Sequence, residues 1–229
     1  MKKIIGLTII LILTILTLTG CAEINYEVEV NKDGSGEISY IYGISKEILS
    51  KLNVSADEVV STMKEQAEES SYTVETYEDE NIAGFKANKH IGDLNKDFSL
   101  QEAFGKEYVK DIENNGIKVE KSFFVTKYSQ NAELDLTTLN KDEQEIIMTY
   151  QVKLPARLTN SNATEVLDNG KTLKWNLKGG EINKIEFVAQ EINVLPIVII
   201  VSAVVLIVGV VVTIIIIILK KKHVTKNEN

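Results

Sequence analysis

Residues 24–44 read INYEVEVNKDGSGEISYIYGI. Apolar residues recur at every second position on each side of a central turn, at Ile24, Tyr26, Val28 and Val30 and then at Ile38, Tyr40, Tyr42 and Ile44. Because successive side chains of a strand point to opposite faces, this alternation predicts two strands that share one buried face. The segment between them is rich in Asp and Gly, which suit the positive φ angles of a hairpin turn. The stretch therefore predicts a β-hairpin.

The turn of this hairpin superficially matches the first half of a calcium-binding loop. Asn31, Asp33, Ser35 and Gly36 stand at its positions 1, 3, 5 and 6. Position 12 would be Tyr42 where such a loop needs a bidentate Glu, and the flanks are strand-like instead of helical. We therefore interpret the segment as a hairpin turn and predict no metal site.

Helical and strand patterns follow one another further along the chain. Ser55 and Ser99 each precede a Glu by three residues, which is the spacing of a helix-capping box. After Ser99, apolar residues at every fourth position predict a helix up to Ile112, weakened by Gly105. The expected helices are 46–52, 55–69 and 100–112, and the expected strands beyond the first hairpin are 72–77, 82–91, 117–128, 132–136, 146–154, 173–177 and 182–189.

Strands outnumber helices and are joined mostly by short turns. Asn169-Gly170 and Gly179-Gly180 are typical hairpin signals. This order predicts an α+β fold with a largely antiparallel β-sheet and two or three helices on one face. One C-terminal transmembrane helix completes the predicted fold class.

The chain opens with MKKIIGLTIILILTILTLTGC, a basic start followed by an apolar run and small residues before a cysteine. This pattern is typical of a secretory signal. Its close, Leu18-Thr19-Gly20-Cys21, resembles the bacterial lipobox, in which the cysteine thiol takes a diacylglyceryl group. We predict a lipoprotein signal peptide at residues 1–20, cleavage between Gly20 and Cys21, and lipidation of Cys21. The alternatives are an uncleaved signal anchor and a plain cleaved signal.

Residues 195–219 contain no charged side chain. At about 1.5 Å per residue they are long enough to cross a hydrocarbon core of about 30 Å. Lys220–Lys222 follow and predict a cytoplasmic C-terminus by the positive-inside rule. The expected product is a lipid-anchored, single-pass protein of the cell membrane, with residues 21–194 outside the cytoplasm and the basic tail 220–229 inside.

Two membrane attachments raise the question of what the lipid is for. A spanning helix alone retains the protein, so lipidation of Cys21 is not needed for attachment. We expect the lipid instead to hold the N-terminus of the domain near the bilayer, so that both ends of the fold face the membrane. Membrane lipid is thus an expected partner of Cys21 and of residues 195–219.

The charge of the chain excludes one class of partner. Residues 21–219 carry 19 of the 25 basic side chains and 32 of the 33 acidic ones, a net charge of 19 − 32 = −13. Such a surface gains nothing electrostatically from nucleic acid or from anionic lipid headgroups. We predict no nucleic-acid partner.

The chain offers few residues for catalysis. A single cysteine excludes an internal disulfide, and His90 and His223 lie on opposite sides of the apolar segment, which leaves no Cys/His metal site. The sequence contains no Gly-rich phosphate loop, Gly-x-Ser-x-Gly elbow or His-Glu-x-x-His helix. The acidic pairs Glu68-Glu69 and Asp142-Glu143 are expected on exposed faces. We predict no catalytic residue, no cofactor and no enzyme.

Several of these features together resemble the LppM-like domain of bacterial envelope lipoproteins. The early ones are the lipobox cysteine and the turn Asp33-Gly34-Ser35-Gly36 between two strands that precede a helix. The late ones are Leu154-Pro155, Thr159-Asn160-Ser161-Asn162, Asn169-Gly170-Lys171 and Leu173-Lys174-Trp175, ahead of a membrane helix. The resemblance covers about residues 21–219. It implies an α+β surface domain without catalytic residues that binds lipid or glycolipid, with Trp175 as a core or barrel-rim aromatic and not a residue that stacks on a ligand.

Three functions are compatible with the sequence. The first is a binding module for a lipid or amphiphilic envelope ligand, held in a cavity between sheet and helices. The second is an assembly protein that recruits a membrane-protein partner through the exposed domain or the spanning helix. The third is a cell-surface hydrolase with paired acids in a cleft. We favour the binding module.

Overall fold

The predicted hairpin lies at the centre of the larger of two sheets. β1 (Ala22–Val30) and β2 (Gly36–Ser45) pair antiparallel, with Tyr26 opposite Tyr40. In the turn, Asp33 Oδ1 accepts hydrogen bonds from the backbone N–H and the hydroxyl of Ser35, at 3.0 and 2.6 Å. Gly34 has a φ of 87°, which a residue with a side chain rarely adopts. The turn chemistry predicted from Asp and Gly is confirmed.

The computed structural model describes residues 22–105, 108–109, 115–139 and 146–226. These described residues divide into two compact units. The first unit holds the residues up to Glu120 together with 127–190, and the second holds 121–126 and the residues from Glu191 onward. Gly20 and Cys21, the predicted cleavage and lipidation residues, lie outside the described residues.

Within the described residues, seven strands form sheet A, in the order β3-β4-β2-β1-β7-β10-β9. β1 and β7 pair parallel, whereas the other neighbours pair antiparallel. The strands beyond the first hairpin are β3 (Thr73–Glu78), β4 (Ile82–Ile91), β7 (Ile147–Lys153), β9 (Glu165–Leu167) and β10 (Thr172–Leu177).

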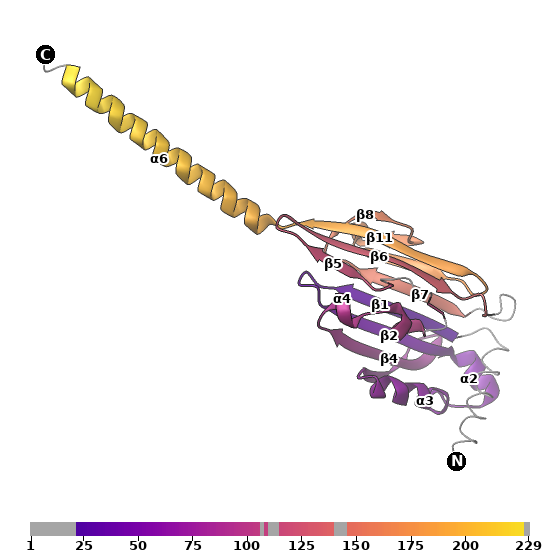
Figure 1. Ribbon diagram of the computed structural model, residues 1–229. Coiled ribbons are helices and arrows are strands. Elements are labelled where there is room, and N and C mark those ends of the chain that lie inside the picture. The colour runs from indigo at the N-terminus through magenta and orange to yellow at the C-terminus, as the bar shows by residue number, and fades with distance from the viewer. Residues whose placement is uncertain (1–21, 106–107, 110–114, 140–145, 227–229) are drawn as a thin grey trace. The chain divides into compact units, whose positions relative to one another are not determined.

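Four further strands in the described chain form sheet B, in the order β5-β6-β11-β8. They are β5 (Lys118–Lys121), β6 (Val125–Asp135), β8 (Arg157–Ser161) and β11 (Ile182–Ile192). Figure 1 shows the strands in two layers, with β1, β2 and β4 in one and β6, β8 and β11 in the other. The predicted fold class, largely antiparallel sheet with few helices and a C-terminal apolar helix, is confirmed, and the division into two sheets is a feature that the sequence pattern did not indicate.

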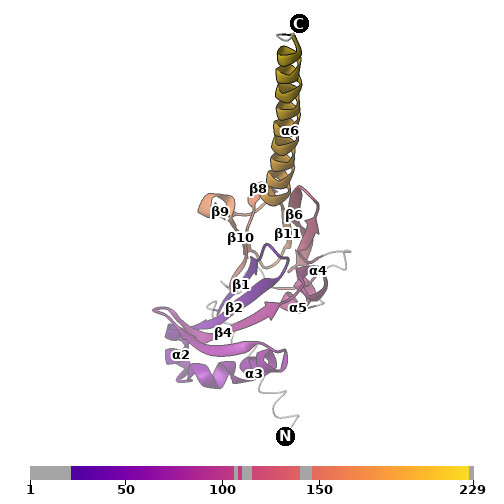
Figure 2. The ribbon, with the colours of Figure 1, turned by 90° about the vertical axis from the view of Figure 1, so that its left-hand side faces the viewer.

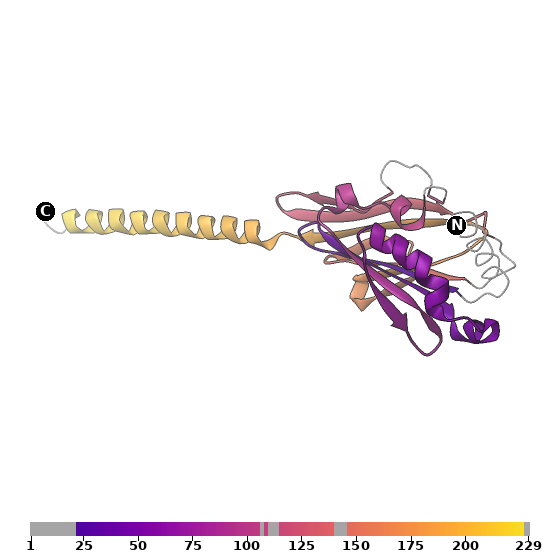
Figure 3. The ribbon, with the colours of Figure 1, turned by 90° about the horizontal axis from the view of Figure 1, so that it is seen from below.

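Four α-helices of the first unit are described, α2 (Lys46–Leu52), α3 (Ala56–Glu69), α4 (Leu94–Asp97) and α5 (Leu100–Phe104), and the 3-10 helix η1 (Asp168–Gly170) follows β9. The serines predicted as caps act as caps. Ser55 Oγ accepts a hydrogen bond from Glu58 N at 3.3 Å, and Ser99 Oγ accepts one from Gln101 N at 3.1 Å. Figure 3, seen from below, shows α3 lying across the strands of sheet A.

One face of sheet A is apolar and the other is polar, as the alternation predicted. In β1, Tyr26 and Val28 are buried, whereas Glu29 is exposed. Sheet B covers the part of the apolar face formed by β7 and β10, and α2 and α3 cover the part formed by β2 and β4. Figure 2 shows α2 and α3 beside β4, at the opposite end of this unit from β8.

The helix predicted for residues 100–112 is shorter than expected. α5 ends at Phe104, and Gly105 follows with a φ of 94°, outside the helical region. Tyr108 lies in a turn, and Val109 forms an antiparallel bridge with Leu134. The prediction is therefore wrong at Gly105, Tyr108 and Val109, because a glycine with positive φ ends the helix and a strand contact takes over at Val109. Its last residues, 110–112, lie outside the described residues.

The strand predicted for residues 117–128 is also wrong in its extent. The chain turns at residues 122–124, and β6 then runs on through Asp135 without the expected break before Ala132. Ser122 closes this turn: its N–H and its hydroxyl donate to the carbonyl of Val125 at 2.9 and 2.6 Å. A serine that bonds locally to the backbone can make a turn without Gly or Pro, so no strong turn signal marks residues 122–124 in the sequence. β8 and β9 were not predicted as strands.

The chain enters and leaves the first unit at opposite ends. β1 begins at Ala22, opposite Ile44, and its other end lies beside Lys153 in β7. Arg157, shortly after β7, pairs with Gln190 in β11. Along β1 the two ends are separated by roughly 26 Å, at about 3.3 Å per residue. The expectation that both ends of the fold face the membrane stays a prediction.

The second unit contains the long helix α6 (Val194–Lys226), coloured orange to yellow in Figure 1. Its segment Val194–Ile217 is, within the described chain, the one helix that is long and apolar enough to cross a membrane. This segment agrees with the predicted span of residues 195–219 to within two residues at each end.

Candidate functional site

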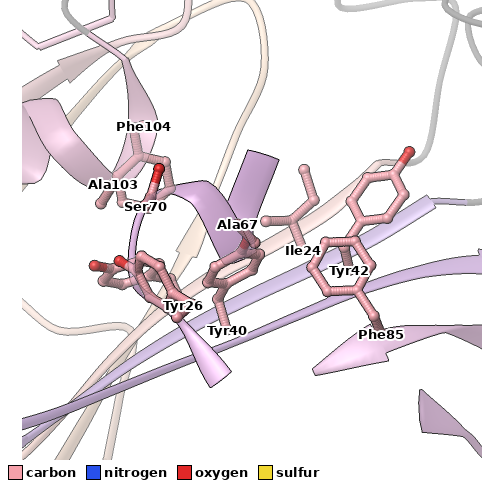
Figure 4. A pocket seen from close by; sticks show the side chains of 10 residues that line it. Ile24, Tyr26, Tyr40, Tyr42, Ala67, Ser70, Phe85, Ala103 and Phe104 are labelled. Carbon is pink, nitrogen blue, oxygen red and sulfur yellow. The ribbon is translucent and has the colours of Figure 1, made fainter. Parts of the chain in front are cut away.

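A pocket of about 290 Å³ opens on the apolar face of sheet A, where α3 and α5 cover it. We call it the aromatic groove. Its lining residues come from β1, β2, β4, the two helices and the segment after α3: Ile24, Tyr26, Tyr40, Tyr42, Ala67, Ser70, Tyr72, Phe85, Ala103 and Phe104. Figure 4 shows Ser70, Ala103 and Phe104 grouped at one end of the pocket and Tyr42 and Phe85 at the other.

The floor of the groove follows from strand register. Tyr26 stands opposite Tyr40, and Tyr42 stands opposite Phe85, so these rings project from neighbouring strands on one face. The rings of Tyr40 and Phe85 meet edge to face with centroids 5.6 Å apart. Such edge-to-face contacts are favourable for aromatic pairs and hold the rings in place.

The walls of the groove explain why space remains above this floor. α3 contributes Ala67 and α5 contributes Ala103, whose side chains are too short to fill the gap above the tyrosines. Larger rings close the sides: Phe104 lies 5.5 Å from Tyr26, and Tyr72 lies 5.3 Å from Tyr40, between ring centroids. In a packed core these two positions would carry larger side chains. Because both are alanines, a cavity that opens to solvent remains above the tyrosines.

The polar groups of the groove are neutral hydroxyls. Burial raises the pKa of Tyr40 to about 12, with a smaller contribution from Tyr72, and burial raises the pKa of Tyr42 to about 12 as well. Within the part of the chain that the structure describes, neither hydroxyl has a hydrogen-bond partner. Both can therefore donate to or accept from a bound molecule at neutral pH.

One cation lies near the groove. Lys89 Nζ sits over the ring of Tyr72, 5.2 Å from its centroid, within the range of a cation–π interaction. Ser70 stands exposed at the opening. An acidic or polar group that stays outside the groove would thus find a cation and a hydroxyl near the groove wall.

The size and chemistry of the groove limit what it can hold. Small-molecule sites usually measure roughly 300–1,000 Å³ and are lined by apolar and aromatic side chains with a few polar groups. At about 290 Å³ the groove lies just below the lower limit of this range. It suits a ring or a single hydrocarbon chain, not an entire two-chain lipid.

The other residues considered from the sequence lie away from the groove. His90 is exposed and pairs with Glu37 across two strands, with 2.5 Å between Nδ1 and Oε1. Glu68 and Glu69 are exposed on α3, and Asp142 and Glu143 lie outside the described residues. Among the described residues, no three His, Cys, Asp or Glu side chains come together to hold a metal ion.

Trp175 is a core residue, as the resemblance implied. It is 3% exposed and packs between Tyr150 and Phe187, with ring centroids 5.6 and 6.2 Å away. Its indole N–H donates to Asn162 Oδ1 at 2.8 Å. This residue therefore belongs to the packed core and not to the aromatic groove.

The sequence pattern indicated the tyrosines on the floor of the groove but not the groove itself. The alternation in residues 24–44 placed Tyr26, Tyr40 and Tyr42 on one buried face, and this placement is confirmed, although Tyr40 is only partly buried. The available signal was the tyrosine content of this face, because tyrosine keeps a polar tip that a sealed core must satisfy. The alanines that open the space look like ordinary core residues in the sequence.

Comparison with known proteins places the chain in a family. Residues 23–191 match the family model of the LppM domain. The NMR structure of the folded domain of Mycobacterium tuberculosis LppM is similar to this chain, with a TM-score of 0.45 and 15% identity over 77% of this chain and 93% of that one. No curated protein matches the sequence significantly. Because the match to the family model extends over more than half of the sequence, the chain belongs to the LppM domain family.

Proposed function

We propose that this protein is a membrane-anchored, non-catalytic binding module whose aromatic groove takes the apolar part of a lipid or other amphiphile. The observation that carries the proposal is an open, aromatic-lined pocket of about 290 Å³ on a sheet face that is otherwise covered by packed side chains. The rings that line this open space are left partly in contact with water, and an apolar ligand would remove that apolar surface from water.

The ligand class follows from the lining. Rings and alanines offer apolar contact, and the hydroxyls of Tyr40 and Tyr42 offer hydrogen bonds without charge. A hydrocarbon chain or ring would enter, and a polar head would remain at the opening near Ser70 and Lys89. The wall residues act by shape and contact, so the proposal requires no catalytic residue and no cofactor.

Two attachments, α6 and a lipid on Cys21, would hold the binding module at the cell membrane. In this proposal α6 crosses the cell membrane, the basic tail from Lys220 lies in the cytoplasm and the first unit lies outside. A lipid on Cys21 would attach directly before Ala22, at the end of the first unit where β1 begins. The mass of the N-terminal peptide from cells tests this: a diacylglyceryl cysteine supports it, and an unmodified Cys21 or a retained signal overturns it.

The groove is tested by blocking its opening. The full chain in nanodiscs is irradiated with palmitic acid that carries a photoreactive diazirine, and adducts on the first unit are measured against probe concentration. Ser70→Trp places an indole at the opening and is expected to raise the half-saturating concentration about tenfold, which corresponds to about 1.4 kcal/mol. The matched control is Ser61→Trp, the same change at an exposed position of α3 outside the groove.

The two variants separate binding in the groove from binding elsewhere. A tenfold weaker response in Ser70→Trp with an unchanged response in Ser61→Trp supports the proposal. Equal responses in the wild type and both variants would contradict it, because the probe would then react without entering the groove.

A further inference from the structure

The turn between β5 and β6 exposes two phenylalanines. Phe123 is 64% exposed and Phe124 is 48% exposed, and their rings meet edge to face with centroids 5.0 Å apart. Ile192 and Val194, which belong to the same unit, are 64% and 63% exposed. Apolar side chains that are gathered and exposed in this way mark a surface that contacts a partner or a membrane.

The turn that carries the two phenylalanines is held in a fixed shape. Ser122 N and Val125 O are 2.9 Å apart, and Val125 N donates back to Ser122 Oγ at 3.2 Å. This closure spans Phe123 and Phe124, so the backbone between the two bonded residues is fixed. The rings are therefore presented by a closed turn.

Asn193 joins this turn to the start of α6. Its backbone N–H donates to Phe124 O at 2.8 Å, and its side-chain amide donates to Ser122 O at 2.8 Å. Its side-chain oxygen accepts from Thr126 Oγ1 at 3.1 Å. Three hydrogen bonds from one residue thus fix the phenylalanine turn next to Val194, the first residue of the apolar helix.

We propose that Phe123 and Phe124 insert into the outer leaflet beside α6, so that the β5–β6 turn is a second membrane contact of the protein. The lipid bilayer is the occupant because the turn is bonded to the residue that precedes the spanning segment Val194–Ile217. Phenylalanine is among the side chains that interfacial segments bury at the boundary between lipid headgroups and acyl chains. The inference rests on α6 crossing the bilayer, as the proposed function states.

The experiment measures the depth of a spin label. A nitroxide is attached to Phe123→Cys in a chain that carries Cys21→Ala, since Cys21 is the one cysteine of the sequence. The full chain is reconstituted in vesicles of phosphatidylcholine and phosphatidylglycerol. Collisions of the label with oxygen, which concentrates in lipid, are compared with collisions with a water-soluble nickel chelate.

Two further labels serve as references. Val205→Cys lies within the proposed span, and Val166→Cys lies on β9 with 49% of its side chain exposed. We expect the label at position 123 to favour oxygen over nickel, as the label at position 205 does, and the label at position 166 to favour nickel.

Other outcomes separate the two claims. If position 205 favours oxygen and position 123 favours nickel, the membrane contact of the turn is wrong and the span stands. If position 205 favours nickel, α6 does not cross the bilayer, and the proposed membrane contact of the β5–β6 turn is then wrong as well. If position 123 is shielded from both reagents and its spectrum shows dipolar broadening, a second copy of the chain covers the turn, which overturns the proposal.

Asn193→Ala tests the connection itself. This change removes the two side-chain hydrogen bonds and keeps the backbone bond to Phe124. The label at position 123 should then move faster and show more nickel collisions, while the label at position 205 stays unchanged. An unchanged label at position 123 would show that Asn193 does not position the turn.

Discussion

The apolar face of sheet A has two halves with different covers. Over β7 and β10, sheet B packs against Tyr150 and Trp175, which are 0% and 3% exposed. Over β2 and β4, α3 and α5 leave the aromatic groove, where Tyr40, Tyr72 and Phe104 are only partly buried. The same kind of aromatic surface is therefore sealed at one end and open at the other.

The polar tips of the aromatic residues show the same difference. In the sealed half, Tyr150 donates its hydroxyl hydrogen to Gln130 Oε1 at 2.9 Å, and Gln130 donates in turn to Asn115 O at 3.1 Å. In the open half, the described residues give Tyr40 and Tyr42 no such partner. Buried polar groups in a finished core are hydrogen-bonded. The sealed half therefore stabilises the fold, and the open half is where the proposed ligand would bind.

A matched pair of substitutions gives the largest expected effect. Phe187→Ala in the sealed half should cost about 3–5 kcal/mol and lower the melting temperature by about 10 °C, because Phe187 is 2% exposed. Phe104→Ala, in the wall of the groove, should cost less than half of that. Near-UV circular dichroism of the full chain in nanodiscs measures both melting temperatures. Equal losses would mean that the two halves are packed alike.

The second largest loss of stability is expected from breaking the buried hydrogen bond between Tyr150 and Gln130. Gln130→Leu keeps the volume of the side chain and leaves the Tyr150 hydroxyl without its acceptor, which should cost about 1–3 kcal/mol. The double variant with Tyr150→Phe removes the unsatisfied hydroxyl and should recover part of the loss. Additive losses in the same melting experiment would contradict the view that the hydrogen bond stabilises this half.

The described strands of sheet A other than β9 follow closely from the sequence, because their two faces differ in polarity. β1 and β2 alternate apolar and polar residues, and both have one face buried as expected. The Ser55 and Ser99 caps were predictable for the same local reason. Features set by a residue and its nearest neighbours could therefore be predicted.

Features set by tertiary contacts could not be predicted. The groove exists because Ala67 and Ala103 lie over tyrosines from other strands, and only the packing of α3 and α5 brings them there. The turn at Ser122 depends on side-chain hydrogen bonds and on Asn193, which is far away in the chain. Neither arrangement leaves a periodic signal in the sequence.

The smallest expected effect is on how the melting temperature changes with pH above pH 10. An unfolded tyrosine titrates near pH 10, whereas burial raises the pKa of Tyr42 to about 12 in the folded protein. Between about pH 10 and 12 the unfolded chain therefore releases protons that the folded chain keeps, so stability is complete below pH 10 and falls as pH rises through this window. Tyr42→Phe should make the melting temperature fall less steeply there. Identical slopes for the variant and the wild type would show that Tyr42 does not contribute.

The central claim is that the open half binds an apolar chain and the sealed half does not. The most direct measurement is a map of the residues that diazirine-bearing palmitic acid modifies in the wild-type chain, obtained by tandem mass spectrometry after digestion. We expect adducts in the first unit on groove residues such as Tyr40, Tyr72 and Phe104, with none on Trp175 or Phe187. Adducts on α6 alone, or equal labelling of both halves, would contradict it.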